Sequence, residues 1–445
     1  MATDSIGTGA RWSMVAISLA VTASAFIFIN GVAFLIPALE NDRGTPLAQA
    51  GLLSSMPSFG MVVTLIAWGY LLDRIGERIV LTVGSVLTAA AAYAATTVHS
   101  MMAIGAFLFV GGMAAASCNA AGGRLVSGWF PPHQRGLAMG IRQTAQPLGI
   151  ALGALVIPEL AEHGPMAGLT FPALMCTVSA VASAIGVIDP PRKPRTAASE
   201  EELANPYRGP QVLRRIHASS ALLMMPQTVT VTFMLVWLIN NHGWSIASAG
   251  TLVTVSQLLG AVGRVLVGRW SDRVGSRLRP VRMIAIAGGL ALVSLAIADH
   301  LKSAYAVPLM VAASVIAVLD NGLESTAITE YAGPYWSGRA LGLQNTYQRL
   351  MAAGGPPVFG ALIVASGYPA AFLVCGLFPL VATPLVPASV RPPEWEAKAQ
   401  QRSGRQPDGS KTAASHESPD ESPLPGPLAQ QRRLRRRGTT AAPPT

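Results

Sequence analysis

Long stretches without a single charged side chain recur along this sequence, and they constrain its fold more than any other feature. Six stretches contain no Asp, Glu, Lys or Arg: residues 13–38, 79–98, 101–123, 167–188, 218–245 and 350–390. A helix of about 20 apolar residues is long enough to cross the ~30 Å hydrocarbon core of a bilayer. Only 12% of the residues are charged, against about a quarter in soluble domains. The sequence therefore predicts a polytopic membrane protein.

Solid apolar runs favour helices over a membrane β-barrel, because barrel strands alternate between apolar and polar residues. Helices also satisfy their backbone hydrogen bonds internally at membrane depth. We expect an all-α membrane protein with twelve transmembrane helices. The expected spans are residues 13–38, 50–72, 79–98, 101–127, 136–157, 168–188, 217–240, 246–270, 280–298, 304–328, 339–364 and 370–390.

Two polar segments divide the chain. Residues 189–216 separate six spans from six, which predicts a six-helix bundle at 1–188, a central cytoplasmic linker at 189–216 and a second six-helix bundle at 217–390. Residues 391–445 are rich in Pro, Ser, Gln and Arg, so we expect a disordered cytoplasmic tail. Its arginine cluster at 432–437 favours anionic lipid over nucleic acid as a partner.

The distribution of basic residues predicts the orientation. With a cytoplasmic N-terminus, the outer loops carry only Arg43 and Lys302, and the inner loops carry most of the arginines. Cytoplasmic loops carry the excess of Lys and Arg, so both termini are expected in the cytoplasm. Arginine outnumbers lysine by 28 to 4, which indicates a GC-rich bacterial genome and hence the plasma membrane.

The two halves of the sequence echo each other. The segment GYLLDRIGER at 69–78 returns 199 positions later as GRWSDRVGSR, and GIRQTAQ at 140–146 returns 202 positions later as GLQNTYQ. Asn119 and Asn321 share the second offset. Two like halves of six spans are typical of a parallel repeat in a transporter. The residues shared by the first echo are Gly69, Asp73, Arg74, Gly76 and Arg78, matched by Gly268, Asp272, Arg273, Gly275 and Arg277.

The pattern G-x3-D-R-x-G-x-R between the second and third spans resembles the loop motif of the major facilitator superfamily, and so does its weaker copy between the eighth and ninth spans. The Gly- and Pro-containing segment 140–153 is similar to the fifth helix of that family. The resemblance covers about residues 13–390. It implies two six-helix bundles related by a pseudo-two-fold axis, a central cavity and alternating access. Glu77 departs from the family pattern, which usually has a basic or neutral residue there.

The loop motif has a physical interpretation of its own. Gly69 and Gly268 allow close approach of helices, and Asp73 and Asp272 lie beside clustered arginines at the expected cytoplasmic edge. Such pairs can hold one conformation and release it when the halves move. The alternative is that the charges only set the topology, which accounts for the arginines but not for the Gly–Asp–Gly spacing.

Arg264 lies within an apolar span, eight residues before Asp272, or about 12 Å along a helix. A charge at that depth is costly unless it faces a cavity or a partner. The local pattern R-x3-G-x3-D is similar to that of monocarboxylate and oxalate-type family members, which implies that this arginine engages a substrate carboxylate. A guanidinium suits an anion because it offers a bidentate fork. Ion pairing between helices is the alternative.

Three further arginines lie in predicted spans. Arg349 is deep, and with Arg142 it is a candidate substrate-binding residue beside Arg264. Arg142 is also close enough to a helix end to snorkel outwards as an alternative, and Arg124 is near the cytoplasmic end of its span. Asp320 and Glu324 stand one turn apart on one helix face. These carboxylates either neutralise Arg349 or Arg124, or carry protons during transport.

Asn30, Gln146 and Gln348 are polar residues within spans, and each either faces the cavity or forms a hydrogen bond between helices. The sequence shows no metal-ligand spacing among Cys and His, no phosphate-binding loop and no catalytic constellation. We therefore expect no metal, no cofactor and no enzymatic activity.

These features favour a secondary transporter that moves a small organic anion, such as a monocarboxylate, with coupling to protons. The expected partners are the small-molecule substrate, the lipid bilayer and protons, without nucleic acid, and a monomer is compatible with the sequence. A multidrug or metabolite exporter of the same family is the first alternative, although the first half has no deep carboxylate to attract cations. A membrane sensor with a transporter fold is the second, although the tail contains no foldable domain.

Overall fold

A computed structural model describes residues 6–390 except 37, 40–44, 46, 165, 192–195, 197 and 210. The predicted disordered tail at 391–445 lies outside the described residues, as does part of the predicted linker. The described part of the chain is helical and contains no strand. The helices are α1 (Thr8–Gly31), α3 (Leu47–Ile75), α4 (Glu77–Thr97), α5 (Met101–Ala115), α6 (Ser117–Trp129), α7 (Pro132–Arg142), α8 (Ala145–Ala161), α9 (Thr170–Gly186), α10 (Glu200–Leu203), α11 (Val212–His242), α12 (Ile246–Val274), α13 (Leu278–His300), α14 (Ala306–Ile316), α15 (Asn321–Ala332) and α16 (Ser337–Leu385), with short 3-10 turns at Val32–Leu35 and Ala167–Leu169.

Within the described residues, eleven helical segments are long and apolar enough to cross a membrane. The last of them, α16, has 49 residues and contains two helices that meet at Gly367, whose backbone (φ 81°, ψ 171°) is not helical. Counting these two helices separately gives twelve crossings, so the predicted fold class is confirmed. Three crossings are built from two helices each, with interruptions at Ala116, at 143–144 and at 317–320.

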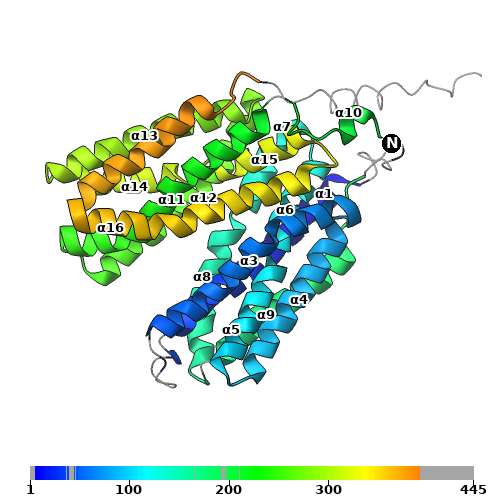
Figure 1. Cartoon of the computed structure of the whole chain (residues 1–445), viewed down its shortest axis with the longest axis horizontal. Coiled ribbons are helices and arrows are strands. Elements are labelled where there is room, and N and C mark those ends of the chain that lie inside the picture. Colours follow the sequence, from blue (N-terminus) through cyan, green and yellow to red (C-terminus); the bar gives the residue numbers. More distant parts are fainter. Residues whose placement is uncertain are drawn as a thin grey trace, which may run out of the picture. The chain divides into compact units, whose positions relative to one another are not determined.

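The crossings pack as two groups. Figure 1 shows α3, α4, α5 and α9 running side by side, and likewise α11, α13, α14 and α16, in agreement with the contacts between these helices. The groups touch where α3 packs on α16 and α7 packs on α12. At these crossings Gly69 faces the carbonyl of Gly338, and Gly268 faces that of Gly136, so closely that a Cβ on either would overlap the backbone. Glycine is what lets these helices approach.

Equivalent contacts recur in the two halves. Ser18 Oγ accepts a hydrogen bond from Arg142 Nε at 3.3 Å, and Ser220 Oγ accepts one from Gln344 Nε2 at 3.1 Å. Both partners of the second pair lie 202 positions after those of the first. The sequence repeat is therefore also a repeat of three-dimensional contacts.

Candidate functional site

The carboxylate of Asp73, at the end of α3, joins the two halves of the molecule. Its Oδ1 accepts the backbone N–H of Gly338 at 2.9 Å and Nη1 of Arg124 at 2.9 Å. Its Oδ2 accepts the backbone N–H of Arg339 at 3.1 Å and Nε of the same arginine at 3.0 Å. The Asp73 side chain is only 1% exposed. It thus stabilises the first turn of α16, where free N–H groups favour an anion.

Asp272, at the end of α12, makes the equivalent contact in the opposite direction. Its two oxygens accept the backbone N–H groups of Gly136 and Leu137 in α7, at 2.9 and 2.8 Å. Arg277 Nη1 donates to the same carboxylate at 2.6 Å, and its Nε donates to Glu330 at 3.2 Å. Gly136 and Leu137 lie 202 positions before the pair that Asp73 binds. Each motif aspartate therefore binds two consecutive backbone N–H groups of a helix in the opposite half.

Arg124 pairs with Asp73 at 2.9 Å and with Glu77 at 2.6 Å. The prediction that Asp320 or Glu324 neutralises this arginine is therefore wrong. The reason is the position of Arg124 along α6. It lies at the end of the bundle where the loop motif is, beside Asp73 and Glu77. Glu77, the departure from the family pattern, supplies one of its two counter-charges.

The remaining motif residues shape the turns. Gly76 (φ 94°) and Gly275 (φ 64°) adopt positive φ values that favour glycine. The N–H of Arg78 donates to the Asp189 carboxylate at 2.7 Å, and burial raises the pKa of Asp189. Arg74 and Arg273 are exposed.

Arg264 is 7% exposed and bridges the two halves. Its Nε donates to the carbonyl of Val318 at 3.0 Å, and its Nη1 donates to the carbonyl of Gln143 at 2.9 Å. Both carbonyls lie at helix interruptions, where the normal intrahelical acceptor role is lost. Asp320 is close enough for its charge to interact with Arg264, but no ion pair between them is formed. The hydrogen-bond partners of this arginine are thus uncharged.

Arg142 points into the first bundle rather than towards the membrane edge. It is 3% exposed and donates to Ser18 Oγ and to the carbonyls of Cys118, at 3.0 Å, and Asn119, at 3.3 Å. The absence of a side chain at Gly122 leaves the space that its guanidinium fills. The prediction that Arg142 snorkels outwards is therefore wrong, because these inward acceptors outcompete the membrane edge.

Arg349 reaches from α16 to the first bundle. Its guanidinium carbon lies 5.4 Å from the ring centroid of Phe26 in α1. Within the described residues it makes neither a hydrogen bond nor an ion pair, so the predicted neutralisation by Asp320 or Glu324 is wrong. A cation–π contact stabilises a guanidinium but leaves its positive charge uncompensated.

Asp320 and Glu324 are both buried within the second bundle. Among the residues that the structure describes, neither carboxyl oxygen of Glu324 has a hydrogen-bond partner. Beside it, Ser220 accepts hydrogen bonds from Gln344 at 3.1 Å and from Gln348 at 2.8 Å. Gln348, expected either in the cavity or between helices, thus makes a hydrogen bond between α16 and α11.

Around the equivalent serines Ser18 and Ser220, the two halves carry ionisable groups of opposite sign, at positions that are not themselves equivalent. Glu324 lies 202 positions after Gly122, and Gln344 lies 202 positions after Arg142. The first half therefore places a guanidinium at its Ser18, whereas the second half places a carboxyl group near its Ser220. The two halves therefore share the hydrogen bond to the serine, but the ionisable group near that serine is basic in the first half and acidic in the second.

The predicted amide side chains differ in the hydrogen bonds that they form. Asn30 donates to the carbonyl of Phe26 in its own helix at 3.1 Å, and Gln146 makes no side-chain hydrogen bond among the described residues. Sequence reasoning missed Gln143, whose side chain donates to the carbonyl of Asn321 at 3.3 Å. It also missed the role of Arg339. Gln143 lies inside the repeated GIRQTAQ segment, which is the signal that would have found it.

Comparisons with known proteins agree with this architecture. The model of the Major Facilitator Superfamily matches residues 16–356. The uncharacterized MFS-type transporter Rv2994 of Mycobacterium tuberculosis is 68% identical over 445 residues, which cover all of both chains. The probable galactarate/D-glucarate transporter GudP of Bacillus subtilis is 21% identical over 402 residues, covering 81% of this chain and 87% of that one.

Solved structures show the same fold. The human organic anion transporter MFSD10 (TETRAN) superposes with a TM-score of 0.67 at 18% identity, covering 86% of this chain and all of that one. The fucose:proton symporter FucP of E. coli has the same TM-score at 15% identity, covering 85% and 99%. Because the family model covers most of the sequence that forms the two bundles, the chain belongs to the major facilitator superfamily and is a multi-pass membrane transporter.

Proposed function

We propose that this transporter moves a small organic anion by alternating access and couples the movement to protons. The observation that carries the proposal is a group of three arginines in the helices, two of which, Arg264 and Arg349, contact the opposite half. Arg264, Arg142 and Arg349 have hydrogen-bond or ring partners that are uncharged, within the described part of the chain.

Arg349 is the strongest candidate for direct contact with substrate. It is partly exposed, extends from one half towards the other and has no counter-ion among the described residues. A carboxylate placed there would neutralise it through the bidentate geometry that a guanidinium offers. Names of relatives point the same way, since galactarate, D-glucarate and hexuronate are all carboxylates. The substrate class is therefore a small carboxylate, either a monocarboxylate or a hydroxylated acid.

Glu324 is the proposed proton carrier, with Asp320 as its neighbour. A charged carboxylate without hydrogen-bond partners is costly in a buried site, and both Glu324 oxygens lack such partners in the described part of the chain. The two carboxyl groups also repel when both are ionised. A proton bound with the anion reduces the charge that crosses the membrane, which lowers the electrical work of transport.

The motif aspartates are proposed as the latch of one conformation. Asp73 and Asp272 each bind backbone N–H groups of a helix in the opposite half, so both contacts break when the halves separate at that end. We assign this end to the cytoplasm of a bacterial cell, with both termini and the 189–216 linker on the same side, because the basic loops gather there.

Substrate-induced thermal stabilisation of the detergent-purified protein tests the anion site. The panel holds small carboxylates, inorganic anions, sugars and lipophilic cations. We expect a carboxylate to raise the melting temperature of the wild type and to lose that effect in Arg349→Gln. Arg282→Gln is the matched control, because Arg282 is exposed on α13, and it should keep the full effect. Stabilisation of the wild type only by sugars or cations would refute the proposal. Equal stabilisation of the wild type and of Arg349→Gln by an anion would refute it as well.

Proton coupling has its own test in proteoliposomes. Uptake of the stabilising carboxylate should be driven by an imposed pH gradient in the wild type. Glu324→Gln should abolish that drive while leaving exchange of labelled for unlabelled substrate, since the neutral amide imitates a permanently protonated carboxyl group. Retained pH-driven uptake in Glu324→Gln would exclude this residue as the proton carrier.

A further inference from the structure

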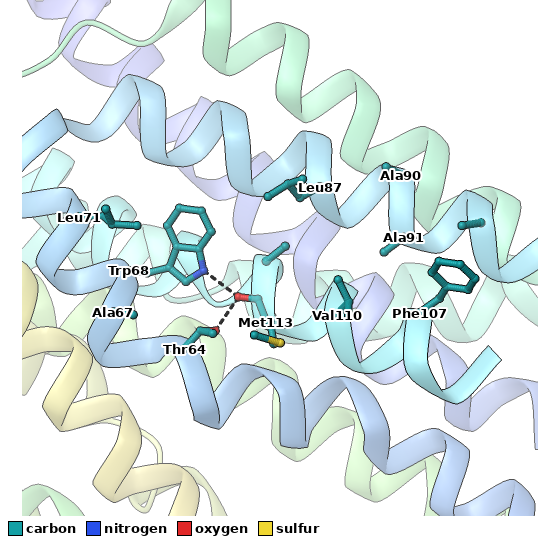
Figure 2. A pocket seen from close by; sticks show the side chains of 12 residues that line it. Thr64, Ala67, Trp68, Leu71, Leu87, Ala90, Ala91, Phe107, Val110 and Met113 are labelled. Carbon is teal, nitrogen blue, oxygen red and sulfur yellow. Dashed lines mark hydrogen bonds between the residues drawn. The ribbon is translucent and has the colours of Figure 1, made fainter. Parts of the chain in front are cut away.

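An open apolar groove lies on the first bundle, and Arg264, Arg142 and Arg349 do not line it. It has a volume of about 610 Å³ and is walled by α3 and α4, with α5 as its floor. Figure 2 shows Trp68 and Leu71 on one side, Leu87 and Ala91 on the other, and Val110 between them. Helices α3 and α4 each pack closely on α5 but make few contacts with each other, and this separation creates the groove.

The polar atoms at the groove are already occupied. Trp68 Nε1 donates to the carbonyl of Met113 at 2.7 Å, and Thr64 Oγ1 donates to the same carbonyl at 2.6 Å (Figure 2). A carbonyl has two lone pairs, so this one is saturated. Water in a cavity needs two to four polar partners, and these two side chains offer only the acceptor lone pairs of Thr64 Oγ1. The natural occupant of the groove is therefore apolar.

The groove opens to the outer surface of membrane-crossing helices. The side chains at its rim are partly exposed, at 38% for Leu71, 47% for Leu87 and 51% for Val110. Left empty, the lining would lose the dispersion contacts that a filled site provides. A volume of 610 Å³ is within the ~300–1,000 Å³ typical of small-molecule sites, and an open, elongated shape between helices suits a hydrocarbon chain.

A cation lies next to one end of the groove. Arg74 comes three residues after Leu71 and therefore shares its face of α3 one turn further on. It is exposed, its guanidinium carbon is 4.5 Å from the Tyr70 ring centroid, and it makes no hydrogen bond or ion pair with another described residue. Arg74 is thus available to a phosphate at the membrane surface, where anionic headgroups lie.

We propose that this groove binds one anionic phospholipid. One acyl chain lies between α3 and α4 over Val110, and the phosphate lies at Arg74. This lipid site does not depend on the transported solute. It lies on the outer face of α3, and Arg264, Arg142 and Arg349 of the proposed anion site do not line it.

Photolabelling tests the acyl-chain site. The probe is phosphatidylglycerol with a diazirine on one acyl chain, present as a minor component of phosphatidylcholine vesicles that hold the full-length protein. We expect labelled peptides from the groove-lining parts of α3, α4 and α5. Ala67→Trp and, independently, Ala94→Phe fill the groove and should each lower this labelling several-fold. Ala287→Trp, at an exposed position of α13, is the matched control and should leave it unchanged.

The headgroup is tested by exchanging the lipid that carries the diazirine. Phosphatidylglycerol should label the groove several-fold more than phosphatidylcholine with the same chain, and Arg74→Gln should remove that difference. Equal labelling by both lipids in the wild type would refute the anionic headgroup. Labelling spread evenly over all helices, labelling unchanged in both filling variants, or crosslinks to a second copy of the chain would overturn the lipid site itself. The labelling of a groove-filling variant is interpreted only if its melting temperature equals that of the control variant Ala287→Trp.

Discussion

Replacing Asp73 by asparagine keeps the size of the side chain but removes the charge of the proposed latch and some of its hydrogen bonds. Each carboxylate oxygen of Asp73 accepts at least two N–H groups, whereas the amide has one oxygen and one NH2 group. Whichever way the amide is oriented, the NH2 group faces at least two donors and cannot accept from them. One orientation loses both hydrogen bonds to Arg339, and the other loses those to Gly338 and Arg124. At least one contact between the halves is therefore lost.

The size of the effect on the conformational equilibrium follows from the strength of hydrogen bonds to a charged group. A hydrogen bond to a charged group contributes about 1.5–3 kcal/mol, so one lost contact between the halves weakens this conformation by about that amount. Each 1.4 kcal/mol is a tenfold change in an equilibrium constant. We therefore expect the halves to separate at the motif end roughly 10- to 100-fold more often in Asp73→Asn. Asp272→Asn should act alike, because Asp272 makes the equivalent contact with α7.

Cysteine accessibility measures that separation. Leu341→Cys is a suitable reporter, because Leu341 is 1% exposed on α16 and faces Gly123 of the first bundle. The native cysteines are all buried, which keeps background labelling low: Cys118, Cys176 and Cys375. The rate of maleimide labelling at the reporter should rise with either motif variant.

Asp299→Asn is the control for general destabilisation. Asp299 is buried, and its partner Trp237 lies in the same half. Its substitution should leave the labelling rate of Leu341→Cys unchanged. An unchanged rate in Asp73→Asn, or an equal increase in Asp299→Asn, would show that the motif carboxylates do not hold the halves together.

Three further predictions, the first with a matched control substitution, concern local contacts and are tested by thermal unfolding. Gly268→Ala places a Cβ against a backbone carbonyl of α7 and should cost about 1–3 kcal/mol, whereas Gly250→Ala in the same helix meets nothing within 4 Å and should gain up to about 1 kcal/mol. Tyr207→Phe removes a 2.8 Å hydrogen bond to a buried imidazole and should cost about 1–3 kcal/mol; an unchanged melting temperature would contradict that. Because the pKa of Asp189 is raised in the folded state, its contribution to stability is present at low pH and is lost as the pH rises through that folded pKa. Asp189→Asn keeps an acceptor for the Arg78 N–H and should abolish this loss, worth at most about 1 kcal/mol for a half-exposed group; the same pH dependence in both proteins would refute the assignment.

The sequence predicted the helices better than their interruptions. Apolar runs are set by the need to exclude charge from the hydrocarbon core, so each predicted span corresponds to a helical crossing. The breaks at Ala116, at 143–144 and at 317–320 carry no proline. They occur where carbonyls accept side-chain donors from distant helices, as Val318 and Gln143 accept from Arg264. No local pattern records such a donor.

The candidate site was predicted in its composition but not in its pairing. Sequence reasoning found the buried arginines and carboxyl groups, because charge inside an apolar run is conspicuous. It offered the wrong partners, Asp320 and Glu324, for the ion pair of Arg124, because a pairing depends on the level and rotation of each helix within the bundle.

By itself, the sequence determined the membrane crossings and the duplication, since both follow from the order of apolar and charged residues along the chain. Only the tertiary structure decided which charges meet. Asp73 contacts Arg339 across 266 residues of sequence, and a hydrogen bond requires its atoms to lie within about 3 Å. That distance is decided by how α3 packs on α16, and the packing depends in turn on glycines that face each other only after the two halves have come together.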